Sequence, residues 1–134
     1  MKILITGAAG FIGSQLAHKL WQKGEEVVLI DNFSYGKEDN LIFEDVNFTE
    51  VIIRMDIRDR AAIKELFREN HFDYVYNIAG IAPLPDCQTN PCEAIDVNLT
   101  GLVNILECAR ETGVRNTIQA STNAMYENET EFPT

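Results

Sequence analysis

The sequence lacks the features that mark secreted, metal-binding or membrane-spanning proteins. It has three cysteines, Cys87, Cys92 and Cys108, and no C-x-x-C pair. This odd count and spacing disfavour a disulfide framework and a zinc site, so we expect free thiols in a reducing cytoplasm and no metal ion. No apolar run approaches the ~18 residues of a membrane-spanning helix. The N-terminal MKILITGAAGFIG is typical of a first strand and not of a signal peptide, because glycines interrupt its apolar stretch.

Positive charge is also scarce. Lys and Arg number 11 against 21 Asp and Glu, for a formal net charge of −10. Nucleic acids and anionic membranes bind surfaces on which Lys and Arg cluster, so we expect neither as a partner. An acidic chain can still bind a phosphorylated small molecule, because backbone N–H groups at a helix N-terminus hold phosphate without side-chain charge. With 134 residues, 46% of them apolar, the chain is long enough for one domain with its own core.

Short apolar runs alternate with helical periodicity along the chain. Strands are predicted over 2–6, 26–31, 51–57, 74–80 and 116–121, and helices over 11–23, 59–70 and 91–112. The last helix carries an apolar side of Ile95, Leu99, Leu102, Leu106 and Ala109. The segment after the second strand is a turn-rich loop with one short element, and 81–90 is a proline-punctuated loop. This alternation predicts a doubly wound α/β fold with a parallel sheet ordered 3-2-1-4-5.

The segment TGAAGFIG stands at the turn from the first strand to the first helix. Its glycines, Gly7, Gly10 and Gly13, follow the spacing G-x-x-G-x-x-G. Gly7 permits a tight turn, Gly10 leaves room for a phosphate, and Gly13 lets the helix pack closely on the strand. The helix N-terminus offers free N–H groups and the positive end of its dipole. A purely structural glycine turn is the alternative, but the strand–turn–helix context favours dinucleotide binding.

The second strand ends at Asp31, followed by Asn32. A carboxylate at this position can accept both ribose hydroxyls of an adenosine and would repel the extra phosphate of NADP. No Arg follows to compensate that repulsion. An Asx turn is the structural alternative for Asp-Asn. Given the glycines upstream, the sequence predicts NAD as the cofactor.

These residues, taken in order, resemble the extended short-chain dehydrogenase/reductases, the NAD-dependent epimerase/dehydratase group that acts on nucleotide sugars. The resemblance covers essentially the whole chain and rests on TGAAGFIG, DNFSYG, MDIRD, NIAGIA, DVNLTGLVNILECAR and ASTNAMYE. It implies an NAD-binding Rossmann fold, a nucleotide-sugar substrate, hydride transfer at a sugar carbon, and a homodimer formed partly through the last helix.

The resemblance also implies individual cofactor contacts. Phe11 and Ile12 would donate backbone N–H groups to the pyrophosphate. Asp56 and Ile57 would bracket the adenine, with the Asp56 carboxylate near the exocyclic amine.

Further residues of the family pattern fall near the nicotinamide. Ala79, Gly80 and Ile81 would line the cofactor cleft beside the nicotinamide ribose. Asn98 would help to order the site, although a satisfied core amide explains it equally well. Thr122 matches the Ser/Thr that hydrogen-bonds the reacting sugar oxygen, and Tyr126 would be an anchoring residue rather than the catalytic tyrosine.

The chain departs from the family pattern at several positions. Asn77 stands where members often have His, and Glu127 where they often have Gly. Dehydratases of the group carry an acidic pair after the Ser/Thr, where this chain has Asn123 and Ala124. An amide and a methyl group cannot act as general acid and base. A sugar 4,6-dehydratase is therefore disfavoured, and epimerase or simple oxidoreductase chemistry stays open.

The catalytic Tyr-x-x-x-Lys of this family does not occur in the sequence, because none of its four tyrosines precedes a Lys at that spacing. We therefore expect residues 1–134 to be the NAD-binding domain of an enzyme of roughly 300 residues, truncated before its catalytic segment. The alternatives are a non-catalytic NAD-binding regulatory module, an atypical NADP-dependent reductase that Asp31 disfavours, and an FMN-binding flavodoxin-like domain that the glycine spacing makes improbable.

Overall fold

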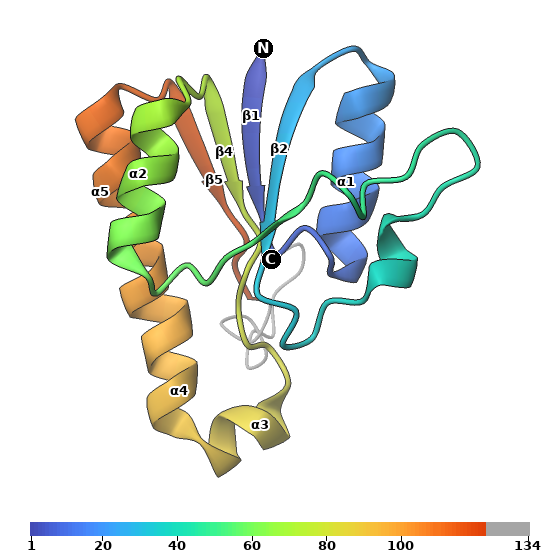
Figure 1. Cartoon of the computed structure of the whole chain (residues 1–134). Helices are drawn as coiled ribbons and strands as arrows, with labels where there is room; N and C mark the ends of the chain where they lie inside the picture. Colours follow the sequence, from blue (N-terminus) through green and yellow to red (C-terminus); the bar gives the residue numbers. More distant parts are fainter. Residues whose placement is uncertain (123–134) are drawn as a thin grey trace, which may run out of the picture.

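A computed structural model describes residues 1–122 and contains one parallel sheet in the order β3-β2-β1-β4-β5 (Figure 1). The strands are β1 (Lys2–Thr6), β2 (Glu26–Asp31), β3 (Ile53–Arg54), β4 (Tyr74–Asn77) and β5 (Asn116–Gln119). Helix α1 (Phe11–Gln22) covers one face, and α2 (Arg60–Glu69) and α5 (Leu102–Thr112) cover the other. The doubly wound α/β prediction and the predicted strand order are confirmed.

The central strands are buried on both faces, as expected for a parallel sheet. In β1, Leu4 packs into the layer of α2 and α5, while Ile3 and Ile5 pack into the layer of α1. All three side chains are almost fully buried. The connection after β2, which includes the 3₁₀ turn η1 (Glu38–Leu41), adds Leu41 and Phe48 to the α1 layer. This explains why the apolar runs do not alternate with polar residues.

The helix boundaries follow from local chemistry. Asp59 caps α2, accepting backbone hydrogen bonds from Ala61 and Ala62 at 3.1 Å each. Gly24 and Gly113 follow α1 and α5 with φ of 79° and 75°, the left-handed conformation that ends a helix. The expected positions of these ends are confirmed.

Three strands are shorter than predicted. β3 pairs with β2 only through Ile53 and Arg54, since the edge strand then turns at Asp56, whose carboxylate accepts the Arg58 N–H. β4 ends at Asn77, three residues before Gly80. β5 ends at Gln119 instead of residue 121. In β3 and β4 the apolar run continues past the strand because the following residues line a cavity at this end of the sheet.

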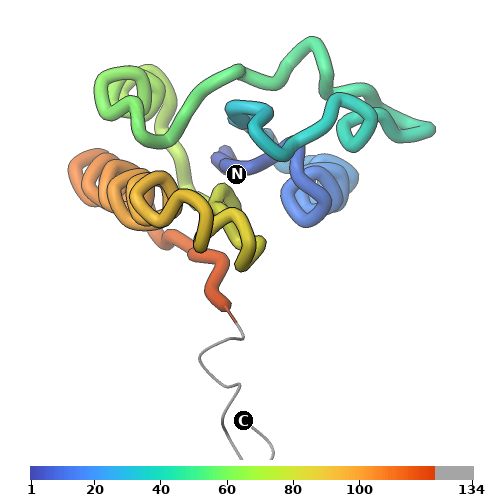
Figure 2. The backbone as a smooth tube through the Cα atoms, turned by 90° about the horizontal axis from the view of Figure 1, so that it is seen from below, coloured from blue at the N-terminus to red at the C-terminus, as the bar shows by residue number. Residues whose placement is uncertain are grey.

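The segment predicted as a proline-punctuated loop contains a short helix, α3 (Leu84–Thr89). Pro85 stands in its first turn, where the missing N–H removes no intrahelical bond. The long helix predicted after it is divided into α4 (Pro91–Ile95), a π-helical turn η2 (Asp96–Gly101) and α5. Figure 1 shows α3 and α4 at the end of the molecule to which the strands run, and Figure 2, viewed from that end, shows α4 continuing the line of α5.

The apolar side expected on the last helix is buried only at Ala109; Leu102 is half-buried, and Ile95, Leu99 and Leu106 are exposed. Ile105, Cys108 and Ala109 are buried against α2 and the sheet, whereas Ile95, Leu99, Val103 and Leu106 are exposed. These four residues form an exposed apolar stripe along α4, η2 and α5. Within residues 1–122 no helix is long and apolar enough to cross a membrane.

Candidate functional site

The carboxyl ends of β1, β2 and β4 surround a cavity of about 500 Å³. Most of the residues predicted to bind a cofactor line it: Gly7, Gly10, Phe11, Ile12, Gly13, Asp31, Asn32, Asp56, Ile57, Ala79, Gly80 and Ile81. The cavity lies where strand order reverses, between β1 and β4, which is the usual ligand position in an open α/β sheet. Asn98 and Thr122 are not among its lining residues.

The glycine turn leaves almost no room for side chains at two of its three positions. A Cβ on Gly13 would stand 2.1 Å from the carbonyl oxygen of Gly7, and one on Gly7 would stand 2.7 Å from the backbone nitrogen of Ala79. Gly7 also has φ of 64°. A Cβ on Gly10 would meet only the Gly7 oxygen, at 3.2 Å. Gly7 and Gly13 are therefore required by packing, while Gly10 keeps a free approach to the N-terminus of α1.

Asp31 both builds the cleft and faces it. Its Oδ2 accepts a hydrogen bond from the Ala9 backbone at 2.9 Å, and its Oδ1 accepts one from the Phe33 backbone at 2.7 Å. The second bond is an Asx turn, and Asn32 forms another by accepting from Ser34 at 3.0 Å. The Asx turn considered as the structural alternative for Asp-Asn is therefore present, and ribose binding by Asp31 stays a prediction. A carboxylate oxygen has two lone pairs, so each oxygen of Asp31 keeps one acceptor position for a ligand.

Asp56 sits in the same cleft with its carboxylate fully engaged. Oδ1 accepts from the backbone and Nε of Arg58, at 2.9 and 3.0 Å. Oδ2 accepts from Arg58 Nη2 at 2.7 Å and from Asn32 Nδ2 at 2.9 Å. The hydrogen bonds of Arg58, helped by Asn32, hold the pKa of Asp56 well below its usual range. These four bonds fill the acceptor positions of the carboxylate.

A buried polar chain supports the other side of the cavity. The Thr6 hydroxyl donates to Asn77 Oδ1 at 2.5 Å and accepts from the Ala79 backbone at 3.1 Å. Asn77 in turn donates to Gln119 at 2.6 Å. Thr6 and Asn77 are almost completely buried. This chain joins β1, β4 and β5 and fixes where the backbone leaves β4 to line the cavity.

Two asparagines of the last helical segment hold the loops of the cavity. Asn98 donates to the carbonyl of Ile81 at 2.9 Å and accepts from its N–H at 2.8 Å. Asn104, which is 6% exposed, donates to the carbonyls of Ile57 and Arg58 at 3.0 and 3.1 Å. Asn98 is exposed, so it is not a core amide. Its two hydrogen bonds hold the loop of the cleft at Ile81. The sequence reading missed Asn104, although an asparagine beside apolar residues at helical spacing was a usable signal.

Tyr35 and Asp86 join the two sides of the cleft and were also missed. The Tyr35 hydroxyl donates to Asp86 Oδ2 at 2.7 Å, linking the connection after β2 to α3. This bond to a carboxylate raises the pKa of Tyr35 above its usual range. Tyr35 lines the cavity, whereas Asp86 is not among its lining residues.

The remaining predicted positions lie at the end of β5. Thr122 is exposed and follows the last residue of β5 by three positions. Asn123, Ala124, Tyr126 and Glu127 are outside the described residues. The three cysteines are free, and residues 1–122 contain no group of His, Cys, Asp or Glu that could hold a metal ion.

The glycine turn at a helix N-terminus, the carboxylate ending β2 and the cavity at the switch point together define a dinucleotide-binding domain of the Rossmann type. The chain belongs to the NAD-dependent epimerase/dehydratase family, whose model matches residues 3–134. The family identification made from the sequence motifs is thus confirmed.

Individual relatives agree with this assignment. The chain is 34% identical to UDP-glucose 4-epimerase of Mus musculus over 98% of its own length and 40% of the mouse sequence. It is 33% identical to the enzyme of that name from Klebsiella pneumoniae over 99% of this chain and 97% of that sequence. UDP-glucose 4-epimerase of Thermus thermophilus, solved in complex with NAD, superimposes with a TM-score of 0.80 and 36% identity, covering 91% of this chain and 38% of that one. Nucleotide-sugar decarboxylases match at similar identity.

Proposed function

We propose that this chain is the NAD-binding part of an NAD-dependent nucleotide-sugar epimerase-type oxidoreductase. The observation that carries the proposal is one continuous cavity joining the glycine turn, the Asp31 carboxylate and the Ala79–Ile81 loop. Relatives of this chain at 33–34% identity include UDP-glucose 4-epimerases. The substrate that we propose is accordingly a nucleotide sugar.

The residues of the cavity fit a dinucleotide chemically. The first turn of α1 presents backbone N–H groups that have no intrahelical partner and suit a pyrophosphate. Asp31 keeps an acceptor on each carboxylate oxygen for the two hydroxyls of a ribose. Ala79, Gly80 and Ile81 would border the nicotinamide end. When bound, NAD would supply hydride transfer to and from a sugar carbon.

Proton transfer is assigned only in part to this chain. Thr122 would donate a hydrogen bond to the reacting sugar oxygen and orient it, as the family resemblance implies. No Tyr-x-x-x-Lys occurs in the sequence. We infer that the tyrosine that removes the hydroxyl proton, and the lysine that lowers its pKa, belong to polypeptide outside these 134 residues.

Epimerisation is favoured over 4,6-dehydration, since Asn123 and Ala124 cannot act as an acid–base pair. The similarity to decarboxylases makes decarboxylation of a sugar acid a second candidate. We further infer a cytoplasmic location, supported by the free cysteines, and a homodimer formed through the exposed apolar stripe, whose residues are 44–62% exposed.

Two alternatives concern the cofactor and its use. A regulatory module that binds NAD without turnover would lack Tyr-x-x-x-Lys in the native gene product as well as in these 134 residues. The NADP alternative draws on Arg54, which pairs with Asp31 between β3 and β2. The Arg54 guanidinium lies 5.2 Å from the centroid of the Phe33 ring. Asp31 remains the carboxylate that an added 2′-phosphate would meet.

The test is to measure NAD and NADP affinity on this chain and turnover on the native gene product. The proposal predicts NAD binding by the chain alone, weaker NADP binding, and interconversion of C4 epimers of a UDP-sugar by the native product. Binding of NAD by a native product that turns over no nucleotide sugar would favour the regulatory module. A chain that binds neither dinucleotide would contradict the proposal.

A further inference from the structure

Helix α3 is weakly anchored to the rest of the molecule. None of its six residues is buried. Within residues 1–122, two side-chain hydrogen bonds join it to other parts of the chain: one from Tyr35 to Asp86 at 2.7 Å, and one from the Cys87 thiol to the carbonyl of Ile81 at 3.6 Å. A thiol is a weak donor. The Tyr35–Asp86 bond is therefore the stronger of the two bonds that hold α3.

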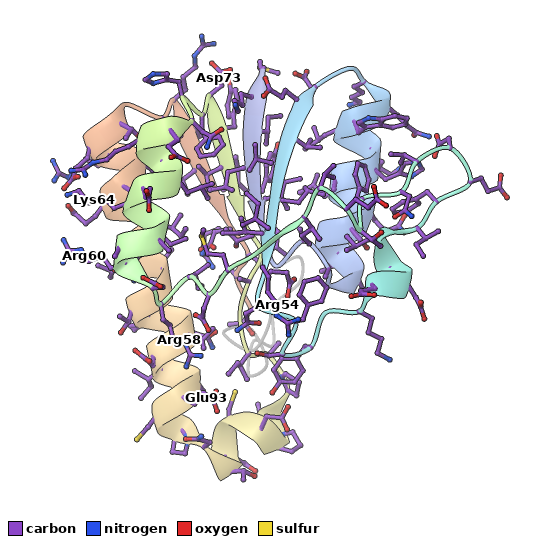
Figure 3. All side chains as sticks on the ribbon, viewed as in Figure 1. Arg54, Arg58, Arg60, Lys64, Asp73 and Glu93 are labelled. Atoms are coloured by element: carbon purple, nitrogen blue, oxygen red, sulfur yellow. The ribbon has the colours of Figure 1, made fainter. Side chains whose placement is uncertain are left out.

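The chain on both sides of α3 is fixed to the cavity. Before α3, Ile81 exchanges two hydrogen bonds with Asn98. After α3, Ala94 of α4 is buried, and Glu93 lies 3.8 Å from Arg58 Nη1. Figure 3 shows the side chains of Glu93 and Arg58 close together. Because α3 buries no residue while both of its ends are held, it can open locally about these ends.

Tyr35 belongs to a different wall of the cavity, which is formed by Ser34, Tyr35 and Gly36. Gly36 packs tightly on the glycine turn, since a Cβ there would stand 2.6 Å from Ala9 Cβ. The Lys37 backbone donates to the Ala9 carbonyl at 3.0 Å. Figure 1 shows this connection after β2 and α3 at the same end of the molecule. Tyr35 is thus presented to α3 from a fixed backbone.

The bond between Tyr35 and Asp86 is suited to open and close. Its formation is the main reason that the pKa of Tyr35 is raised, and the charges of Asp86 and Glu93 add to the effect. The Tyr35 hydroxyl therefore keeps its proton at neutral pH and remains a donor. Both residues are exposed, so water competes for this bond and its net contribution is modest.

We propose that the Tyr35–Asp86 hydrogen bond is a latch between two walls of the cavity, and that it must open for a dinucleotide to enter or leave. Because both residues are exposed, the bond lies on the solvent side of the walls that it joins. The ends of the strands form the floor of the cavity. A dinucleotide extending along this floor, from the glycine turn to the loop 79–81, would lie between the floor and the latch. The inference rests on the proposed NAD binding and adds control over the rate of cofactor exchange.

The test measures the association and dissociation rate constants of NADH by stopped-flow nicotinamide fluorescence, with excess ADP-ribose as the chase. It compares the wild-type chain with Tyr35→Phe, which removes only the hydroxyl, with Asp86→Ala and with the double variant. Asp45→Asn is the matched control, because Asp45 pairs with His18 at 2.6 Å and accepts from Gln22 at 2.9 Å. These bonds also hold the connection after β2, but Asp45 does not line the cavity. Thermal unfolding checks that every variant is folded.

A latch predicts that Tyr35→Phe and Asp86→Ala each raise both rate constants by the same factor, about threefold to tenfold, and leave Kd unchanged. The double variant should show no further increase, because one bond accounts for both effects. Asp45→Asn should keep the wild-type rates. Unchanged rates in Tyr35→Phe, or faster dissociation alone with weaker binding, would overturn the latch while leaving the proposed NAD binding intact. A wild-type chain that does not bind NADH would contradict the proposed function and the latch with it.

Discussion

Asp31 and Asp56 both carry carboxylates at the same edge of the sheet, but their hydrogen bonds leave different atoms available. Asp31 accepts one bond on each oxygen, both from backbone groups of the cleft. Asp56 accepts two bonds on each oxygen, mostly from Arg58. The first is therefore suited to bind a ligand directly, and the second to orient another side chain. Their different roles lead to two predictions.

Asp31→Asn should weaken NAD binding by at least about tenfold, because the amide replaces one acceptor by a donor. It should also reduce the preference for NAD over NADP, since the negative charge that repels a 2′-phosphate is gone. Calorimetric titration with both cofactors measures each effect. Asp39→Asn in the exposed turn η1 is the control. Equal NAD affinity in Asp31→Asn and the wild type would be incompatible with ribose binding at this position.

The Asp56–Arg58 pair predicts a pH-dependent contribution to stability. The pKa of Asp56 is lower in the folded state than in the unfolded state, chiefly through its hydrogen bond with Arg58. The stabilisation is thus complete above the unfolded pKa of about 4 and is lost as the pH falls toward the lower folded value. The difference in free energy of unfolding between wild type and Asp56→Asn should shrink as the pH drops below about 4. Urea unfolding at a series of pH values measures it, and a difference independent of pH would refute the assignment.

At the scale of elements, the turn between β1 and α1 combines two requirements that substitutions can separate. Gly13→Ala places a Cβ 2.1 Å from the Gly7 oxygen. Helix α1 or the end of β1 must move to relieve this contact. Its free energy of unfolding should fall by about 3 kcal/mol, at the upper end of the range for overpacking. Gly10→Ala meets only one atom, at 3.2 Å, so it should retain most stability but bind NAD more weakly. Urea unfolding and cofactor titration of both variants test this, and equal stability losses would contradict it.

The last helical segment is a second element with a defined role, since it holds two loops of the cleft through Asn98 and Asn104. Asn104→Ala leaves two carbonyl groups without their donor and should lower the free energy of unfolding by about 1–3 kcal/mol. Asn116→Ala, at an exposed position at the start of β5, should change it by less than about 0.5 kcal/mol. Chemical denaturation distinguishes the two, and an Asn104→Ala variant as stable as Asn116→Ala would show that these bonds are not stabilising.

Sequence patterns predicted the parts of this fold that local chemistry determines. The glycine turn, the cap at Asp59 and the glycine after α5 depend on nearby residues, and all were located correctly. The parts that were missed depend on residues distant in sequence. Asn104 gains its role only when α5 packs beside the turn after β3, and Asn32 donates to Asp56 only after β2 and β3 pair. Ile105 and Cys108 are buried, and Leu99 and Leu106 are exposed, because of how α5 packs against α2 and the sheet.

At the scale of the whole molecule, one side of the last helical segment remains apolar and exposed. The stripe of Ile95, Leu99, Val103 and Leu106 crosses three helical elements. A continuous patch of this kind favours association, and it is independent of the cavity at the strand ends.

The chain is therefore expected to self-associate with increasing concentration in sedimentation velocity. Val103→Lys should shift it toward the monomer, since a charge placed in an apolar contact loses hydration. Val51→Lys replaces an equally exposed apolar residue away from the stripe and should leave association unchanged. A wild type that stays monomeric at all concentrations would rule out association through this stripe.

Calorimetric titration of the chain with NAD is the most direct test of the central claim, which is that the cavity at the switch point of the sheet binds a dinucleotide. The account predicts saturable binding of one NAD per chain, competed by ADP-ribose because the glycine turn and Asp31 hold the adenosine diphosphate half. It would be contradicted by the absence of NAD binding, or by NAD binding that ADP-ribose does not compete.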